Sequence, residues 1–158
     1  YGAALKTGFL NSKTEFLGFL DADITYHPKY IPMLLELIEK NNIDCAWCNR
    51  FGGTYNRMPL ERKLGNKVIA LIFLIVTGKY IPDVTCGERV FRKKSMMKLN
   101  PITLPNGLDM TSALSKRIVF RKLRYKIIPC DYAEREGSSK LNAFKDFVNM
   151  LRDIIFER

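Results

Sequence analysis

A short apolar run at residues 16–20, with the sequence FLGFL, ends in two carboxylates, Asp21 and Asp23. Five apolar residues are the length of a buried strand, and the charged residues that follow are typical of a loop. Ligands of open α/β sheets bind outside the carboxyl ends of the strands, so we expect these carboxylates at a binding edge. Two carboxylates this close repel each other unless a cation lies between them, and hard oxygen ligands suit Mg²⁺ or Mn²⁺. On its own, the Asp-x-Asp pair favours a simpler role, capping the helix that begins near Pro28.

Strand-like and helix-like segments alternate along the 158 residues. Apolar runs predict strands at residues 16–20, 43–49, 83–92 and 125–130. Helical spacing predicts helices at residues 1–12, 28–40, 60–77, 95–99, 108–122 and 142–156. The alternation indicates the α/β class, and without a linker we expect one domain or a large piece of one.

The predicted helix at residues 60–77 is apolar nearly all round between Val68 and Val76. Such a helix is either deeply buried or partly immersed in lipid, and core packing is the more frequent cause. The apolar run is shorter than the roughly 20 residues that span a bilayer. No secretory leader is visible after Tyr1.

The formal net charge is +10, so we expect acidic partners. Two basic clusters stand out, which a solvated basic face would also explain. The first contains Arg89, Arg92, Lys93, Lys94 and Lys98; the second contains Lys116, Arg117, Arg121, Lys122, Arg124 and Lys126.

Cys45 and Cys48 have the spacing of a redox or zinc motif, but they lie in a predicted strand. Residues three apart on a strand point to opposite faces, so the two sulfurs are poorly placed to share one metal. The lone His27 cannot complete such a site. We therefore predict that all four cysteines, including Cys86 and Cys130, are buried and reduced.

Four motifs follow one another in a characteristic order. They are GAALKTGF from Gly2, FLDAD ending at Asp23, DVTCGERVFR from Asp83 and REGSSKL from Arg135. In order and spacing they resemble the family 2 glycosyltransferases of the GT-A fold. The resemblance is greatest to dolichol-phosphate mannosyltransferase and its polyprenyl-phosphate sugar-transferase relatives, and it extends from Gly2 to about Ile155.

The resemblance implies an inverting, metal-dependent hexosyltransferase. The donor would be a nucleotide sugar of the GDP-mannose or UDP-glucose type, and the acceptor a dolichyl or undecaprenyl phosphate. Asp21 and Asp23 would bind Mg²⁺ or Mn²⁺ and the donor diphosphate, with Asp23 also catalytic. The enzyme would work peripherally at the cytoplasmic face of a membrane, where its apolar helix and basic residues meet anionic lipid.

The resemblance also assigns roles to an acid and to several cations. Asp83 would lie near the acceptor as a base or an orienting carboxylate, although it could equally cap the start of a strand. A turn with flanking cations can clamp phosphate, and Arg135, Ser139 and Lys140 would form that clamp. Arg50, Arg62 and Arg89 would stabilise the leaving diphosphate or hold the acceptor phosphate, although each could be an ordinary surface ion-pair partner.

Family members open with a nucleotide-binding half that has no counterpart in these residues. The resemblance therefore implies that residues 1–158 are the C-terminal part of a single GT-A domain, N-terminally truncated and with an incomplete nucleotide pocket. The sheet would then have an exposed edge.

Two alternatives remain open. One is a transferase of the same fold that acts on a glycan or protein hydroxyl, with Asp83 as a true base. The other is a basic, non-catalytic module that binds membranes or nucleic acid. No nucleic-acid-binding motif is present, so we do not expect nucleic acid as a partner.

Overall fold

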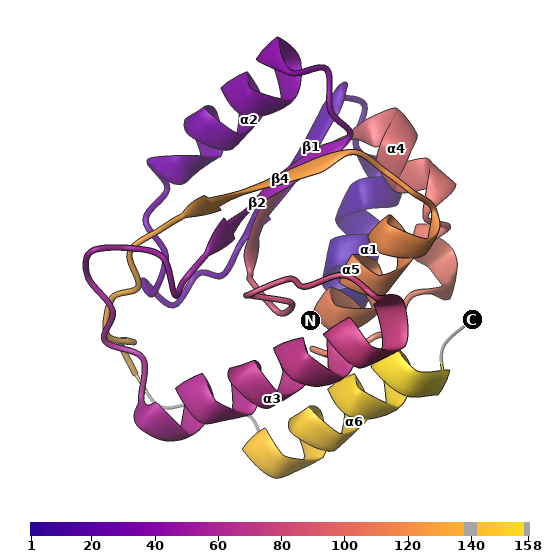
Figure 1. The fold of residues 1–158 in the computed structure, drawn as a ribbon. Coiled ribbons are helices and arrows are strands. Elements are labelled where there is room, and N and C mark those ends of the chain that lie inside the picture. Colours follow the sequence, from indigo (N-terminus) through magenta and orange to yellow (C-terminus); the bar gives the residue numbers. More distant parts are fainter. Residues whose placement is uncertain (138–141, 157–158) are drawn as a thin grey trace.

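A four-stranded sheet with helices on both faces forms the centre of the computed structural model, which describes residues 1–137 and 142–156 (Figure 1). The strands are β1 (Phe16–Leu20), β2 (Cys45–Asn49), β3 (Glu88–Arg92) and β4 (Tyr125–Pro129). The helices are α1 (Gly2–Asn11), α2 (Tyr30–Lys40), α3 (Leu60–Thr77), α4 (Lys93–Lys98), α5 (Met110–Phe120) and α6 (Ala143–Phe156), with a short 3₁₀ turn η1 (Pro101–Thr103). The predicted α/β class is confirmed.

The strands lie in the order β1-β3-β2-β4. β3 is antiparallel to both β1 and β2, whereas β2 and β4 are parallel. β1, β2 and β4 therefore run in one direction, and their carboxyl ends share one edge of the sheet. Within the described residues, β1 pairs with β3 alone, as expected for an edge strand. The strand predicted at residues 83–92 begins only at Glu88, because Asp83 is held outside the ladder by Arg50.

Helices cover the two faces of the sheet differently (Figure 1). On one face, Phe19 packs against Phe9 of α1, with ring centroids 6.1 Å apart, and Arg89 donates to Ser115 of α5. The other face lies under α2, whose Leu34 and Ile38 are fully buried. Successive strand residues alternate between these faces, so each strand contributes to both halves of the core.

α3 is half-buried. Ile69, Ala70 and Phe73 face the core. The opposite side carries an exposed apolar stripe, defined by Leu60, Leu64, Val68, Leu71 and Ile75. The helix ends as predicted at Gly78, whose left-handed φ of 69° lets its N–H bond the Leu74 carbonyl. α6 lies alongside α3 (Figure 1). In the part of the chain that the structure describes, no helix is long and apolar enough to cross a membrane.

The two predicted basic clusters do not form one solvated face. Lys116 and Arg89 are buried, and Arg117 donates to the carbonyls of Leu99, Asn100 and Thr103. The exposed Arg124 and its neighbours precede β4, so they lie at the edge where the parallel strands begin. The prediction that the basic residues of the second cluster meet anionic lipid therefore does not fit Lys116 and Arg117, whose side chains bond the protein's own backbone.

The four cysteines are free and buried, as predicted.

Candidate active site

Asp21 directly follows β1, at the edge where the parallel strands end. Its N–H donates to the Gly87 carbonyl (3.1 Å), and its Oδ1 accepts from the Tyr1 hydroxyl (2.8 Å). A Cβ on residue 87 would collide with the Asp21 carboxylate. Gly87 is therefore required so that the loop before β3 can pass behind this carboxylate.

Asp23 is held by two partners from different parts of the chain. The backbone N–H and the hydroxyl of Thr25 donate to Oδ1, and the Arg135 guanidinium forms an ion pair with Oδ2. The N–H of Ala133 donates to the Thr25 carbonyl (2.9 Å), so residues 133–135 run beside the Asp-x-Asp turn. The structure thus brings Arg135 to the carboxylate pair, 112 residues away in sequence.

The two carboxylates have opposite electrostatics. Burial raises the pKa of Asp21, and the charge of Asp23 raises it further, despite the Tyr1 hydrogen bond and the positive charges of Arg50 and Arg135. Burial also raises the pKa of Asp23, but hydrogen bonds from Thr25 and Arg135 outweigh it, so the net pKa is lowered. Hydrogen bonds and an ion pair thus favour the charge of Asp23, whereas burial disfavours the charge of Asp21, and a cation between the two carboxylates would stabilise both charges.

The alternative role as a helix cap is wrong. α2 begins after Lys29, and no side-chain hydrogen bond caps its first turn. Asp21 and Asp23 therefore do not serve α2.

Asp83 forms a buried ion pair with Arg50. Its Oδ2 accepts from the Arg50 backbone N–H (3.0 Å) and Nε (2.7 Å), and its Oδ1 accepts from Nη2 (2.6 Å). The same Nη2 also donates to Thr85 (2.9 Å) and Asn66 (3.3 Å). Asp83 is fully buried, so this bidentate pair fixes the guanidinium rather than capping a strand.

Tyr26 connects this ion pair to the Asp-x-Asp turn. Its hydroxyl accepts from the Gly87 N–H (2.8 Å), and the Arg50 guanidinium lies 5.9 Å from its ring centroid. Arg50 also lies 5.6 Å from the ring of Tyr132. Asp21, Gly87 and Arg50 thus belong to one contiguous cluster.

The remaining predicted site residues have different fates. Arg89 is fully buried, and its guanidinium donates to the carbonyls of Cys86 (2.8 Å) and Val84 (2.7 Å). It supports the loop before β3 from inside the core, so the prediction that it touches substrate does not fit its burial. Arg62 lies in the first turn of α3, where its carbonyl accepts from Asn66. Ser139 and Lys140 lie outside the described residues.

The sequence interpretation missed Tyr1, Tyr26 and Asp131. Asp131 accepts from the backbone N–H groups of Thr54 and Tyr55 and from the Tyr30 hydroxyl. These bonds lower the pKa of Asp131 to about 2. It follows the end of β4 as Asp21 follows β1, so a carboxylate after a short apolar run was the signal that could have revealed it.

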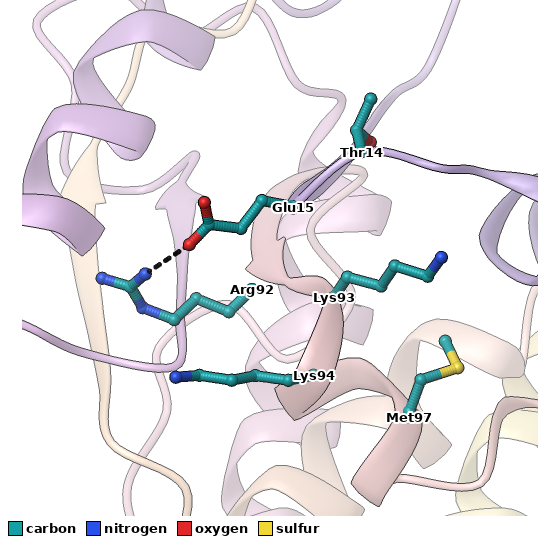
Figure 2. A pocket seen from close by; sticks show the side chains of 6 residues that line it. All are labelled: Thr14, Glu15, Arg92, Lys93, Lys94 and Met97. Atoms are coloured by element: carbon teal, nitrogen blue, oxygen red, sulfur yellow. Dashed lines mark hydrogen bonds and ion pairs between the residues drawn. The ribbon is translucent and has the colours of Figure 1, made fainter.

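A surface hollow of about 340 Å³ lies elsewhere (Figure 2). Its lining consists of Thr14, Glu15, Arg92, Lys93, Lys94 and Met97. Glu15 pairs with Arg92 there (Figure 2). Glu15 precedes β1 and Asp21 follows it, so the hollow lies at the opposite end of this strand from Asp21. It contains no predicted site residue.

Comparisons with known proteins identify the family and the fold. The family model described as "Glycosyl transferase family 2" matches residues 1–99, more than half of the chain. Among curated proteins of Haloferax volcanii, the low-salt glycan biosynthesis hexosyltransferase Agl6 is 26% identical over 92% of this chain and 36% of its own length. The dolichyl-phosphate hexose transferase of that organism is 27% identical over 91% of this chain and 61% of its own length.

Solved structures support the fold. Glucosyl-3-phosphoglycerate synthase from Mycobacterium tuberculosis, in complex with Mn²⁺, UDP and glucosyl-3-phosphoglycerate, matches with a TM-score of 0.72. It is 15% identical, and the match covers 98% of this chain and 53% of that one. The same enzyme in complex with phosphoglyceric acid gives a TM-score of 0.69.

The chain thus spans about a third to two thirds of the length of these relatives and has a GT-A-type fold. The family model covers the Asp21–Asp23 turn, the Arg50–Asp83 pair and the loop before β3. This chain belongs to glycosyltransferase family 2.

Proposed function

We propose that this chain carries the metal-binding and acceptor side of an inverting glycosyltransferase that moves a hexose from a nucleotide sugar to a polyprenyl phosphate. The observation that carries the proposal is the Asp21–Asp23 pair, held at the carboxyl edge of the sheet by Gly87 and Arg135. Both Haloferax volcanii relatives are named as hexose transferases, and one is named for dolichyl phosphate.

Asp21 and Asp23 would hold Mg²⁺ or Mn²⁺. The donor set fits, because both side chains offer the hard carboxylate oxygens that these ions prefer, and the negative charge of Asp23 acts on Asp21. When bound, the ion would neutralise charge on the diphosphate of a donor of the GDP-mannose or UDP-glucose type. The solved Mycobacterium tuberculosis relative was captured with Mn²⁺ and UDP, which agrees with this choice.

The cations of the chain would orient the phosphates. Arg135 now neutralises Asp23, and a bound cation would free its guanidinium to contact a donor or acceptor phosphate. Arg50 is fixed by Asp83 and approaches the same cluster. Arg62, Ser139 and Lys140 would complete the phosphate contacts.

Asp83 would act by orienting Arg50 rather than by removing a proton. Both of its oxygens accept hydrogen bonds from Arg50, so neither is free to take a proton from an acceptor. A phosphate acceptor is already an anion at neutral pH and needs no strong base. The pairing therefore favours a polyprenyl phosphate over the alternative acceptor, a glycan or protein hydroxyl.

The exposed stripe of α3 is where the enzyme would meet the membrane. Leu60, the first residue of the stripe, lies two residues before Arg62, close in sequence to the phosphate-binding residues. Five apolar side chains on one helix face favour an interfacial position, with Lys63 and Lys67 beside them for anionic headgroups. Phe144, Val148 and Ile155 of the neighbouring α6 are also exposed. Attachment would be peripheral and on the cytoplasmic face.

The test is sugar transfer into membranes that contain polyprenyl phosphate. Labelled GDP-mannose and UDP-glucose are offered with Mn²⁺ or Mg²⁺, using the chain by itself and within its complete reading frame. We expect metal-dependent label in the lipid fraction, lost in Asp23→Ala and kept in the control Asp44→Asn. Label on glycan or protein would replace the acceptor class. A folded protein that transfers from no donor would overturn the proposal.

A further inference from the structure

Two thiols and one carboxylate meet in the core behind the candidate active site. Cys48 lies one residue before the end of β2, Glu88 begins β3, and Cys130 follows β4. One Sγ or carboxylate oxygen from each lies within 4.8 Å of the others, and all three residues are buried. None of them has a part in the proposed transfer reaction.

Backbone pairing builds this cluster. The register that sets Trp47 opposite Arg89 places Cys48 opposite Glu88. The Cys130 N–H donates to the Asn49 carbonyl (3.0 Å), which keeps Cys130 beside the end of β2. Cys48 and Glu88 project from the face covered by α2, whereas Arg89 projects from the other. Three strands therefore deliver one side chain each to one point.

Glu88 is the anomaly of the cluster. It is fully buried, and within the described residues neither carboxylate oxygen has a hydrogen-bond partner. A buried carboxylate without a partner is costly and rare in folded proteins. One of its oxygens lies within 4.8 Å of both thiol sulfurs, and a ligand between them would account for all three groups.

We propose that Cys48, Glu88 and Cys130 bind a divalent transition-metal ion, for which zinc is the best fit, at a site separate from Asp21 and Asp23. Two thiolates select a borderline-soft ion over Mg²⁺ or Mn²⁺, and a carboxylate is a common third ligand of zinc. Binding would displace the protons of both thiols and of the carboxyl group, leaving a fourth position for water. Cys86 lies nearby, but its Sγ already accepts from the Glu88 N–H (3.4 Å).

Such an ion would tie together the segments that hold the candidate active site. Cys48 lies two residues before Arg50, and Glu88 follows Gly87, against which Asp21 packs. Cys130 precedes Asp131, which holds residues 54 and 55. The ion would therefore act as a structural tie with no direct part in transfer.

Cobalt substitution tests the proposal, because Co²⁺ bound to thiolate gives sulfur-to-metal charge-transfer absorption and Co²⁺ bound to the oxygens of Asp21 and Asp23 does not. We expect this absorption in the wild-type protein, and its loss in Cys48→Ser and Cys130→Ser. It should persist in Cys45→Ser, the matched buried cysteine on the same strand, and in Asp23→Ala. The last result would separate this site from the one proposed for catalysis.

Zinc affinity gives a second measurement. In competition with a chromophoric chelator, Glu88→Gln should weaken binding at least as much as the roughly 10- to 100-fold that loss of an outer-shell partner causes. Zinc should also raise the unfolding temperature of the wild type but not of Glu88→Gln, which keeps the shape of the side chain. An absent charge-transfer band, or a Cys48–Cys130 disulfide in the purified protein, would overturn the proposal whatever the transferase assay gives.

Discussion

Acidic residues lie at both ends of the parallel strands, but their hydrogen bonds and burial differ between the two ends. At the edge where the parallel strands begin, Asp44 accepts from the Ser95 hydroxyl (2.6 Å) and the Arg124 N–H (2.8 Å), and these bonds lower its pKa despite partial burial. At the edge where the strands end, Asp21 has one side-chain hydrogen bond, from Tyr1, and its pKa is raised by burial.

This difference in hydrogen bonding and pKa distinguishes Asp44, a structural carboxylate, from Asp21, which we expect to bind a ligand. Asp44 is satisfied by donors of its own chain, so it stabilises the fold as it stands. Asp21 is disfavoured in its charged form by burial and by the charge of Asp23, and a cation bound between the two carboxylates would offset both effects. Asp23 is intermediate between these two cases. The Arg135 guanidinium compensates its negative charge, but Arg135 could move away when a ligand binds.

The largest expected effect is on transfer in Asp23→Asn. Loss of one carboxylate of a metal and diphosphate site should lower the transfer rate by roughly 100- to 1,000-fold, the order seen when one transition-state contact is removed. The measurement is initial-rate transfer at saturating Mn²⁺. Asp44→Asn serves as the control and should keep its rate. An equal loss of transfer rate in Asp23→Asn and Asp44→Asn would contradict the functional difference between the two ends of the strands.

Removal of Asp83 should have the largest effect on stability. Asp83→Ala leaves the Arg50 guanidinium buried without its partner, which should lower the free energy of unfolding by about 3–5 kcal/mol. Urea denaturation followed by circular dichroism measures it. Asp83→Asn, which retains the shape, should lose less. A loss below about 1 kcal/mol in Asp83→Ala would mean that the pair is not buried in solution.

Asp44→Asn should lower the free energy of unfolding by about 2 kcal/mol at neutral pH, because charged hydrogen bonds from Ser95 and Arg124 are lost. The pKa of Asp44 is lowered from 3.8 in the folded state, so its contribution is complete above pH 3.8. That contribution disappears as the pH falls below 3.8 through the folded-state value. Urea unfolding at a series of pH values should show that the wild type and Asp44→Asn converge in acid. Parallel curves would contradict this role.

The smallest expected effect on the free energy of unfolding is in Asp21→Asn. Because burial and Asp23 disfavour the charge of Asp21, its removal should leave the free energy of unfolding within about 1 kcal/mol of the wild type, or slightly above it. Transfer should nevertheless fall with that of Asp23→Asn. A marked destabilisation would show that Asp21, like Asp44, has a structural role.

Local sequence patterns predicted most of the secondary structure. The apolar run before Asp21, the glycine stop of α3 at Gly78 and the spacing of residues 142–156 each specify their element through short-range rules. The order of the motifs also indicated the family. The predicted strand at residues 83–92 was too long because long-range pairing of Asp83 with Arg50 interrupts it, which no local pattern contains.

By itself, the sequence determined the α/β class, the position of Asp21 and Asp23 after a buried strand, and the family, because periodicity and motif spacing are local properties. Only the tertiary structure decided which charged side chains can contact a ligand and which are buried or paired within the protein. Arg89 and Lys116 are buried, Arg50 is fixed by Asp83, and Arg135 reaches Asp23 across 112 residues. Burial and pairing depend on how distant strands and helices pack, and a charge has the same letter in the sequence whether it faces solvent, a partner or the core.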